Sequence, residues 1–262
     1  MADLSGRVAL VTGGGRGIGE AVALALADAG CDVAVLARSA GEVLRVADRV
    51  RDRGRRAHAV AADVSDAPAL ASAVRSTERA LGRTDIAVLG AGVIQPLGAT
   101  LAVDPAEWER ALAVNVLGAL HVVRAVVPAM VNAGWGRVVA VSSGAASPPG
   151  MPSASAYSAS KAALEMLCAQ LADELDGTGV TVNAVRPGVV DTAMQERMRA
   201  EPPESVGERF HARFHGLHER GELLAPEVPA GFVARLVATG LTGEVLDVRD
   251  DSARARLAAT ER

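Results

Sequence analysis

The stretch Thr12-Gly13-Gly14-Gly15-Arg16-Gly17-Ile18-Gly19 decides the fold of this chain. It follows the apolar run Val8-Ala9-Leu10-Val11 and precedes a helical pattern over residues 19–29. A strand, a glycine-rich turn and a helix form the arrangement that receives the phosphates of a dinucleotide. Glycines lack the Cβ atoms that would keep the backbone away from a pyrophosphate, and the N–H groups that begin the helix face the anion. An ordinary glycine-rich turn has the same composition, so the prediction depends on the position between strand and helix.

Strand-like and helical segments alternate along the rest of the chain. Apolar runs predict strands over residues 8–11, 33–36, 57–61, 86–89, 138–141, 180–185 and 244–248. Amphipathic patterns predict helices over residues 19–29, 42–53, 105–130, 156–175 and 226–238, and one more that ends near residue 81. Pro128 is expected to kink or end the helix over residues 105–130. This order predicts an α/β fold, with a doubly wound parallel sheet of about seven strands and helices on both faces. We expect a single domain over residues 1–250 and a frayed tail over residues 251–262.

The composition argues against several kinds of partner and site. The net charge of −4 argues against electrostatic binding to nucleic acid. The two cysteines, Cys31 and Cys168, stand far apart in apolar surroundings, which indicates free thiols in a reducing compartment and no metal site. The N-terminus lacks a signal-peptide pattern, and no run reaches the ~18 apolar residues that a membrane span needs. We therefore expect a soluble, cytoplasmic protein.

Tyr157 is the only tyrosine of the chain, and Lys161 follows it by four residues. On a helix these positions share one face, and a neighbouring ammonium lowers the pKa of a tyrosine from ~10. A tyrosine so placed can act in general acid–base catalysis, although the same spacing also occurs by chance on helix surfaces. Ser142 and Ser143 follow a strand, at the carboxyl edge of the sheet where ligands bind. Either hydroxyl can hold a substrate oxygen beside Tyr157 or cap a turn.

Taken together, these motifs resemble the short-chain dehydrogenase/reductase family over roughly residues 5–248. The resemblance is carried by the 12–19 glycine stretch, Asp63-Val64, Asn115, Ser142-Ser143, Tyr157-Ser-Ala-Ser-Lys161 and Arg186-Pro-Gly-Val-Val-Asp-Thr192, in the family's order. It implies a Rossmann-type fold and an oxidoreductase that transfers a hydride between a nicotinamide and a carbonyl/secondary-alcohol pair.

The resemblance also implies a role for each catalytic residue. Tyr157 would be the general acid in reduction and the base in oxidation. Lys161 would bind the ribose of the nicotinamide and lower the pKa of the tyrosine. Ser143 would hydrogen-bond the substrate oxygen, and Asn115 would anchor a water that links Lys161 to solvent.

The implied cofactor site draws on segments that follow several strands. Its phosphate loop comprises Thr12, Gly13, Gly15, Arg16, Gly17, Ile18 and Gly19. Asp63 and Val64 border the adenine, Ala91 and Gly92 bring backbone close to the cofactor, and the nicotinamide side is lined by Pro187, Gly188, Val190 and Thr192.

The end of the second strand favours NADP(H) over NAD(H). An acidic residue there would bind the 2′-hydroxyl of the adenosine, but the chain reads Leu36-Ala37-Arg38-Ser39. Arg38 and Ser39, together with Arg16 of the glycine stretch, suit a phosphate dianion. The alternative is that Arg38 is simply solvated.

The chain departs from the family pattern at three places. Gly90 stands where the family usually has an asparagine that braces the central sheet. The loop over residues 144–156 is about one residue longer than is common, which leaves the choice between Ser142 and Ser143 open. The last strand-like segment, residues 241–249, lacks the usual closing glycine pair.

Residues 191–225 correspond to the family's substrate lid. We expect its apolar wall to comprise Met194, Met198, Phe210, Phe214 and Leu217. His211, His215 and His218 share a helical spacing, but no carboxylate or cysteine completes a metal shell, so we interpret them as a solvated face and expect no metal.

The family usually forms homodimers or homotetramers through the long helices near residues 105–130 and 156–175, and the same is expected here. Two other functions share this fold. One is a non-catalytic dinucleotide-binding sensor or scaffold, favoured only by Gly90 and the altered C-terminus. The other is an epimerase or dehydratase, for which about 70 residues after Asp191 leave little room for a substrate domain.

Overall fold

A computed structural model describes residues 3–259 and has the expected doubly wound α/β architecture. Its strands are β1 (Val8–Thr12), β2 (Asp32–Ala37), β3 (Ala57–Ala61), β4 (Ile86–Leu89), β5 (Gly136–Val141), β6 (Val180–Arg186) and β7 (Val245–Asp247). They pair in parallel in the order β3-β2-β1-β4-β5-β6-β7. Strands β1 and β4 are buried throughout, because helices cover both faces of the sheet. This burial explains their continuous apolar runs.

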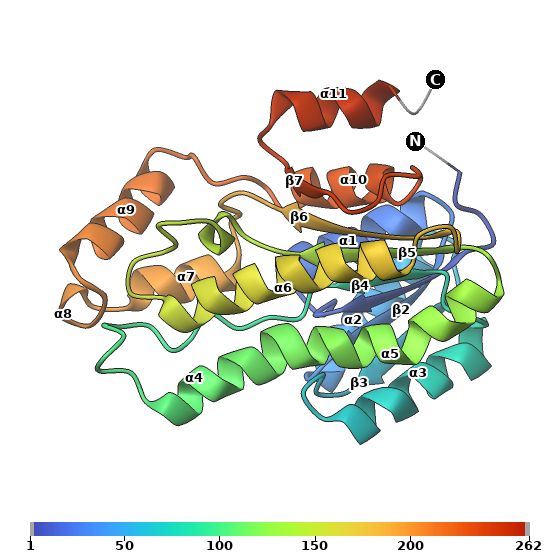
Figure 1. Cartoon of the computed structure of the whole chain (residues 1–262), viewed down its shortest axis with the longest axis horizontal. Coiled ribbons are helices and arrows are strands. Elements are labelled where there is room, and N and C mark those ends of the chain that lie inside the picture. Colours follow the sequence, from blue (N-terminus) through green and yellow to red (C-terminus); the bar gives the residue numbers. More distant parts are fainter. Residues whose placement is uncertain (1–2, 260–262) are drawn as a thin grey trace.

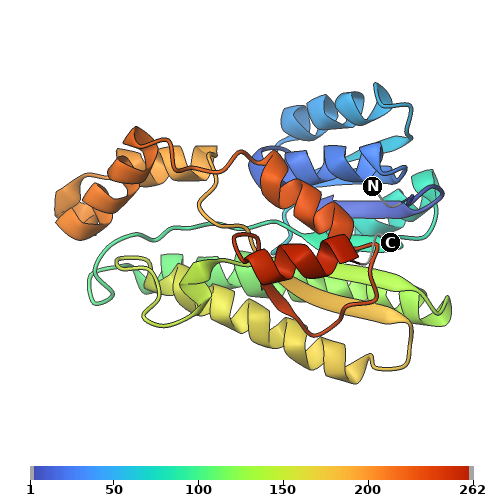
Figure 2. The same ribbon diagram turned by 90° about the horizontal axis from the view of Figure 1, so that it is seen from above.

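Two helical layers enclose the sheet (Figures 1 and 2). One face is covered by α1 (Gly17–Asp28), α2 (Ala40–Arg51), α10 (Glu227–Leu236) and α11 (Asp251–Ala259). The other is covered by α3 (Ala67–Leu81), α5 (Gly118–Asn132) and α6 (Ser155–Glu174). The lid helices α7 (Ala193–Ala200), α8 (Pro203–Val206) and α9 (Glu208–Glu219) project beyond the end of the sheet in both views.

The direction of winding reverses at β1, which pairs with β2 on one side and with β4 on the other. The next residues along the chain, Gly13 after β1 and Gly90 after β4, therefore leave the sheet side by side. Crevices at such reversal points bind ligands in open α/β sheets. This position is where the glycine stretch lies.

A long helical run passes from α4 (Pro105–Leu112) through a π-helical turn, η1 (Ala113–Leu117), into α5. Asp104 caps its start by accepting a hydrogen bond from the backbone N–H of Ala106 at 2.9 Å. Pro128 does not end the run, because α5 continues to Asn132 and buries Met130 in the core. By length and hydropathy the run Pro105–Asn132 is long enough to cross a membrane, and half of its apolar window is buried within the fold.

The expectation of a frayed tail is wrong for residues 251–259, which form α11. Ala253 and Leu257 lie four residues apart on one face of this helix and are buried in the core that contains α10. Burial of this short apolar stripe holds the segment against the domain. Residues 260–262 lie outside the described residues.

Candidate active site

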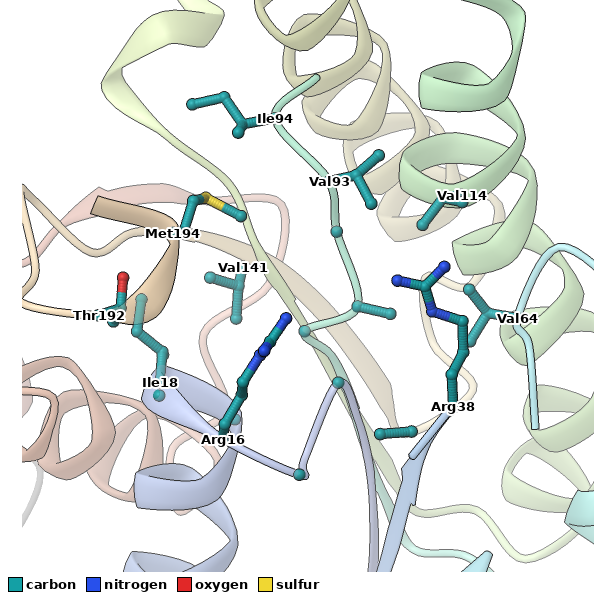
Figure 3. Close-up of a pocket in the computed structure, with 18 of the residues that line it drawn as sticks. Arg16, Ile18, Arg38, Val64, Val93, Ile94, Val114, Val141, Thr192 and Met194 are labelled. Carbon is teal, nitrogen blue, oxygen red and sulfur yellow. The ribbon is translucent and has the colours of Figure 1, made fainter. Parts of the chain in front are cut away.

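A cavity of about 350 Å³ opens at the carboxyl ends of β1 and β4 (Figure 3). Most of the residues expected in the site line it: Gly13, Gly15, Arg16, Gly17, Ile18, Gly19, Arg38, Ser39, Asp63, Val64, Ala91, Gly92, Tyr157, Lys161, Pro187 and Thr192. Segments far apart in the sequence thus meet around one space.

The glycine stretch is shaped for close backbone approach. Gly13 has φ +66°, and a Cβ at this position would lie 2.6 Å from the Gly90 carbonyl oxygen. A Cβ on Gly19 would lie 2.2 Å from the carbonyl oxygen of Gly13. Helix α1 begins at Gly17, so its free N–H groups face the cavity where a diphosphate would sit. These features fit a dinucleotide.

Thr12 was expected in the lining of the cavity, but the structure places it elsewhere. It is 1% exposed and lies beneath the loop, where its hydroxyl donates to the Val88 carbonyl at 3.1 Å and accepts from the Gly90 N–H at 3.2 Å. Thr12 therefore supplies a side-chain brace between β1 and β4. A Cβ on Gly90 would lie 2.7 Å from the Thr12 carbonyl oxygen, so glycine suits this close packing.

Arg16 and Arg38 extend into the cavity from two sides (Figure 3). Arg38 is exposed and follows β2, whereas Arg16 approaches Glu42 of α2, with 3.6 Å between Nη1 and Oε1. Glu42 also lines the cavity, and sequence reasoning missed it. The Ser39 hydroxyl accepts a hydrogen bond from the Glu42 N–H and caps α2.

Asp63 is held by its own loop. Burial alone would raise the pKa of this carboxyl, but hydrogen bonds from Ser65 and the charge of Arg38 leave the pKa below its ordinary value. Its Oδ1 accepts from the N–H and hydroxyl of Ser65 at 2.9 and 2.7 Å. The Asp63 carboxylate is thus ionised and lines the pocket at the end of β3.

Tyr157 and Lys161 stand on the buried face of α6, as the four-residue spacing predicted. The Lys161 Nζ lies 5.7 Å from the centre of the Tyr157 ring and donates to the Val141 carbonyl at 2.7 Å. Burial lowers the pKa of Lys161 to about 8. Burial raises the pKa of Tyr157, against a smaller lowering by its hydrogen bond with Ser143. The net direction is upward because desolvation of the buried phenol dominates, and the lowering of the tyrosine pKa by Lys161 stays a prediction.

The two serines after β5 have different surroundings. The Ser142 hydroxyl donates to Glu165 of α6 at 2.6 Å, and Arg186 binds the same carboxylate through Nε and Nη2 at 2.8 and 2.6 Å. Ser143 accepts from the Ala145 N–H at 3.1 Å, and its hydroxyl lies near enough to Tyr157 to lower the pKa of the phenol. Ser143 is thus the serine that acts on the tyrosine, but it does not line the cavity as expected, whereas Ser142 does. Glu165 was missed, although its place two turns after Tyr157 sets it on the same side of the helix.

Asn115 lies in the π-helical turn, is 1% exposed and does not line the cavity. Its amide accepts from the Val93 N–H at 2.8 Å and donates to the Val93 carbonyl and the Ser160 hydroxyl, both at 2.9 Å. Asn115 therefore fixes the loop after β4 to α6. The expected role as a water anchor stays a prediction.

Two other residues expected on the nicotinamide side lie away from the cavity. Val190 is 4% exposed and pairs with Leu224 in an isolated bridge. Gly188 has φ +80°, and a Cβ there would lie 2.9 Å from the Leu224 side chain. Both residues tie the start of the lid to its end, because the chain from 188 to 190 packs against Leu224.

The lid meets the cavity through a smaller surface than the sequence predicted. Met194 lines the cavity on the same side as Ile94 (Figure 3), whereas Met198, Phe210 and Phe214 are buried inside the lid. The rings of His211 and His215 stack at 4.1 Å, and His215 contacts the Arg199 carbonyl. Among residues 3–259, no group of three or more His, Cys, Asp or Glu side chains could hold a metal ion.

Comparison with known proteins gives the class of the chain. Residues 7–203 match the family model described as short chain dehydrogenase. The oxidoreductase UcpA of Escherichia coli K12 is 37% identical over 210 residues, which cover 79% of each chain. The chain belongs to the short-chain dehydrogenase/reductase family, and is an oxidoreductase that binds a nicotinamide dinucleotide and acts on small molecules.

Solved structures share the same architecture. A short-chain type dehydrogenase/reductase from Mycobacterium marinum superposes with a TM-score of 0.83 at 32% identity, over 94% of each chain. A protein from Beutenbergia cavernae, described as a putative NAD(P)-dependent gluconate 5-dehydrogenase with bound NADP, gives a TM-score of 0.83 at 35% identity, over 97% of this chain and 98% of that one.

Proposed function

We propose that this protein is an NADP(H)-dependent oxidoreductase that interconverts a carbonyl compound and a secondary alcohol. The observation that carries the proposal is that Tyr157 and Lys161 line the same cavity as the glycine stretch, with Ser143 beside Tyr157 just outside the lining. A bound nicotinamide supplies or accepts the hydride, and the protein supplies position and the proton.

The proton chemistry falls to Tyr157. Because burial raises its pKa, the phenol is protonated at neutral pH and can donate to a carbonyl oxygen that is being reduced. The Ser143 hydroxyl, which lies beside the phenol, would hold the same substrate oxygen. The Lys161 ammonium lies beneath the ring and stabilises the tyrosinate that forms, which then returns to the phenol by taking a proton.

Arg38, Arg16 and Ser39 would hold the 2′-phosphate of NADP(H). Ala37 closes β2 without a carboxylate that would repel this group, and the Arg38 guanidinium forms no ion pair with residues 3–259 closer than 4.0 Å. The NADP bound at low occupancy in the Beutenbergia cavernae relative supports the choice. The glycine stretch and the N-terminus of α1 would take the diphosphate.

The catalytic part is tested with Tyr157→Phe in an assay of NADPH oxidation over a panel of ketones and aldehydes. Removing a general acid lowers kcat by about 10²–10⁴-fold. The dissociation constant for NADPH, measured by fluorescence, should stay unchanged. Retained turnover in Tyr157→Phe would contradict the mechanism, and tight NADPH binding without turnover in the wild type would favour a sensor or scaffold.

The cofactor part is tested with Arg38→Ala. A lost charge-assisted contact corresponds to about a tenfold to hundredfold rise in the Kd for NADPH. The Kd for NADH, which lacks the phosphate, is the internal control and should not change. Tighter binding of NADH than of NADPH by the wild type would overturn the assignment.

We further propose a cytoplasmic homodimer or homotetramer assembled through the two long helical segments. Leu117 of η1 and Met166 of α6 are large apolar side chains that are 47% and 62% exposed, and a partner subunit would cover them. Light scattering on a size-exclusion column gives the oligomeric state, and a monomer at micromolar concentration would contradict this proposal.

A further inference from the structure

Helix α7 of the lid has two faces with different surroundings. Ala193, Met194 and Arg197 recur at helical spacing and line the cavity. Gln195 and Met198 lie on the adjoining face and are buried within the lid, where Met194 packs against the same apolar cluster as Met198. The fold therefore presents one apolar and one cationic side chain of this helix to whatever fills the cavity.

Arg197 has no partner among the described residues 3–259: its guanidinium makes neither an ion pair nor a hydrogen bond with them. Arg16, by contrast, already approaches Glu42. An exposed arginine is often only solvated, but this one shares its cavity-lining face with Met194. A guanidinium in this setting is available to an anionic group of a ligand.

The position of Arg197 favours the substrate over the cofactor. Thr192, which precedes α7, lies beside the phosphate loop, with its Cγ2 3.2 Å from where a Cβ on Gly17 would be. Arg197 follows five residues later, about 7 Å farther along the helix axis. The phosphate loop has its own donors in the N–H groups of α1 and in Arg16. Ile94 and Tyr157, by contrast, line the cavity and belong to the apolar cluster that contains Met198 of the lid.

We propose that Arg197 binds a carboxylate of the substrate, so that this enzyme acts on carbonyl or hydroxyl compounds that carry an acidic group. The proposal rests on the function proposed above. The planar guanidinium can hold both oxygens of a carboxylate, while Met194 and Ile94 cover the carbon skeleton. Gln95 has no side-chain hydrogen bond with the described part of the chain and offers the substrate a further polar group.

The kinetic test compares keto acids with their own methyl esters, using levulinate, phenylglyoxylate and 4-acetylbenzoate. In the wild type we expect a higher kcat/KM for the acid than for its ester. In Arg197→Gln the ratio of acid to ester should fall about tenfold to hundredfold, mainly through KM for the acid. Arg197→Lys should keep part of the preference, since it keeps the charge without the planar fork.

Arg209→Gln is the matched control, because Arg209 is an exposed lid arginine outside the cavity lining. It removes the same charge and should leave the ratio unchanged. An equal fall in Arg209→Gln would show a general effect of lid charge and overturn the assignment. An acid-to-ester ratio that Arg197→Gln leaves unchanged would overturn it as well.

A binding measurement separates this proposal from the proposed function. Calorimetry on the NADPH complex of Tyr157→Phe, which binds without turnover, should show each acid binding more tightly than its ester, with the difference lost in Tyr157→Phe/Arg197→Gln. If the wild type turns over neither these pairs nor the panel of ketones and aldehydes, the proposed function fails while calorimetry still decides the role of Arg197. A weaker Kd for NADPH in Arg197→Gln, with no difference between acid and ester, would assign Arg197 to the cofactor phosphates instead.

Discussion

Lys161 is the only lysine of the chain, and every other cationic side chain apart from histidine is an arginine. It is 5% exposed, and burial lowers its pKa to about 8. A desolvated lysine can lose its proton near neutral pH, whereas an arginine keeps its charge. The one lysine of the chain is therefore placed in the candidate active site, where its ammonium can exchange a proton. Labelling the protein with 13Cε-lysine would therefore give a single side-chain resonance. We expect its titration midpoint near pH 8, and a midpoint near 10.5 would contradict the burial of this group.

The same group makes stability depend on pH. Between about pH 8 and 10.5 the unfolded chain holds a proton on Lys161 that the folded chain has lost, so the free energy of unfolding rises with pH through this window. The total gain is on the order of 3 kcal/mol. In Lys161→Met this contribution disappears. Urea unfolding at pH 7.5, 8.5 and 9.5 should show the wild type gaining stability relative to the variant, and a constant difference would contradict the prediction. Both proteins carry Cys168→Ala in this comparison, because the charge of Lys161 lowers the pKa of the Cys168 thiol, whereas the raised pKa of Cys31 affects both alike and cancels.

Single residues also show what the sequence could and could not reveal about the site. Glycine requirements at Gly13 and Gly19 follow from the motif, because a Cβ at either position would meet backbone. The partners of Thr12, Ser142 and Asn115 could not be predicted, since each hydroxyl or amide bonds a group from a distant part of the chain. Hydrogen-bond partners depend on tertiary packing, which local spacing does not encode.

At the scale of elements, the Glu165–Arg186 pair joins α6 to the end of β6. The carboxylate accepts three hydrogen bonds, two of them from Arg186, and the arginine pKa is raised mainly by this contact. Both side chains are largely buried, at 12% and 23% exposure. In Glu165→Gln the guanidinium would keep its charge without a counter-charge, which should cost about 2 kcal/mol.

Urea unfolding at pH 7 measures this cost. Glu174→Gln is the matched control, because Glu174 is exposed near the end of the same helix and should change the stability by less than about 0.5 kcal/mol. A loss in Glu165→Gln no larger than in the control would mean that the pair contributes nothing. Double substitution of Glu165 and Arg186 should recover part of the loss, since it removes the unpaired charge as well.

Elements with a clear period were predictable, and those shaped by packing were not. The seven strands stand out as runs of small and β-branched residues, because both faces of a parallel sheet are buried. The π-helical turn Ala113–Leu117 carries no such signal, since it arises where Asn115 turns inward to bond the loop after β4. The polar sequence of α11 suggested fraying, yet two apolar residues four apart were enough to hold it to α10.

At the scale of the whole molecule, the sheet divides the interior into two apolar cores. Cys31 belongs to the core that contains α1 and α10, and Cys168 to the core that contains α5 and α6. The two layers share every strand, so neither core can open without exposing the sheet. We therefore expect the chain to unfold as one cooperative unit, as the prediction of a single domain requires.

The two thiols can report on this cooperativity independently. Burial raises the pKa of each to about 12, so at pH 8 only about one native molecule in 10⁴ carries a thiolate at either site. Labelling by a thiol reagent must then proceed through opening of the surrounding core. In low concentrations of urea, mass spectrometry of the labelled peptides should give equal rates for Cys31 and Cys168, with the same dependence on urea. The single variants Cys31→Ala and Cys168→Ala serve as controls that each remaining thiol keeps its rate. A much faster labelling rate at one cysteine would show that its layer opens alone. Such a rate means that the free energy of opening there is smaller than the global free energy of unfolding, which marks a separate unit of the fold.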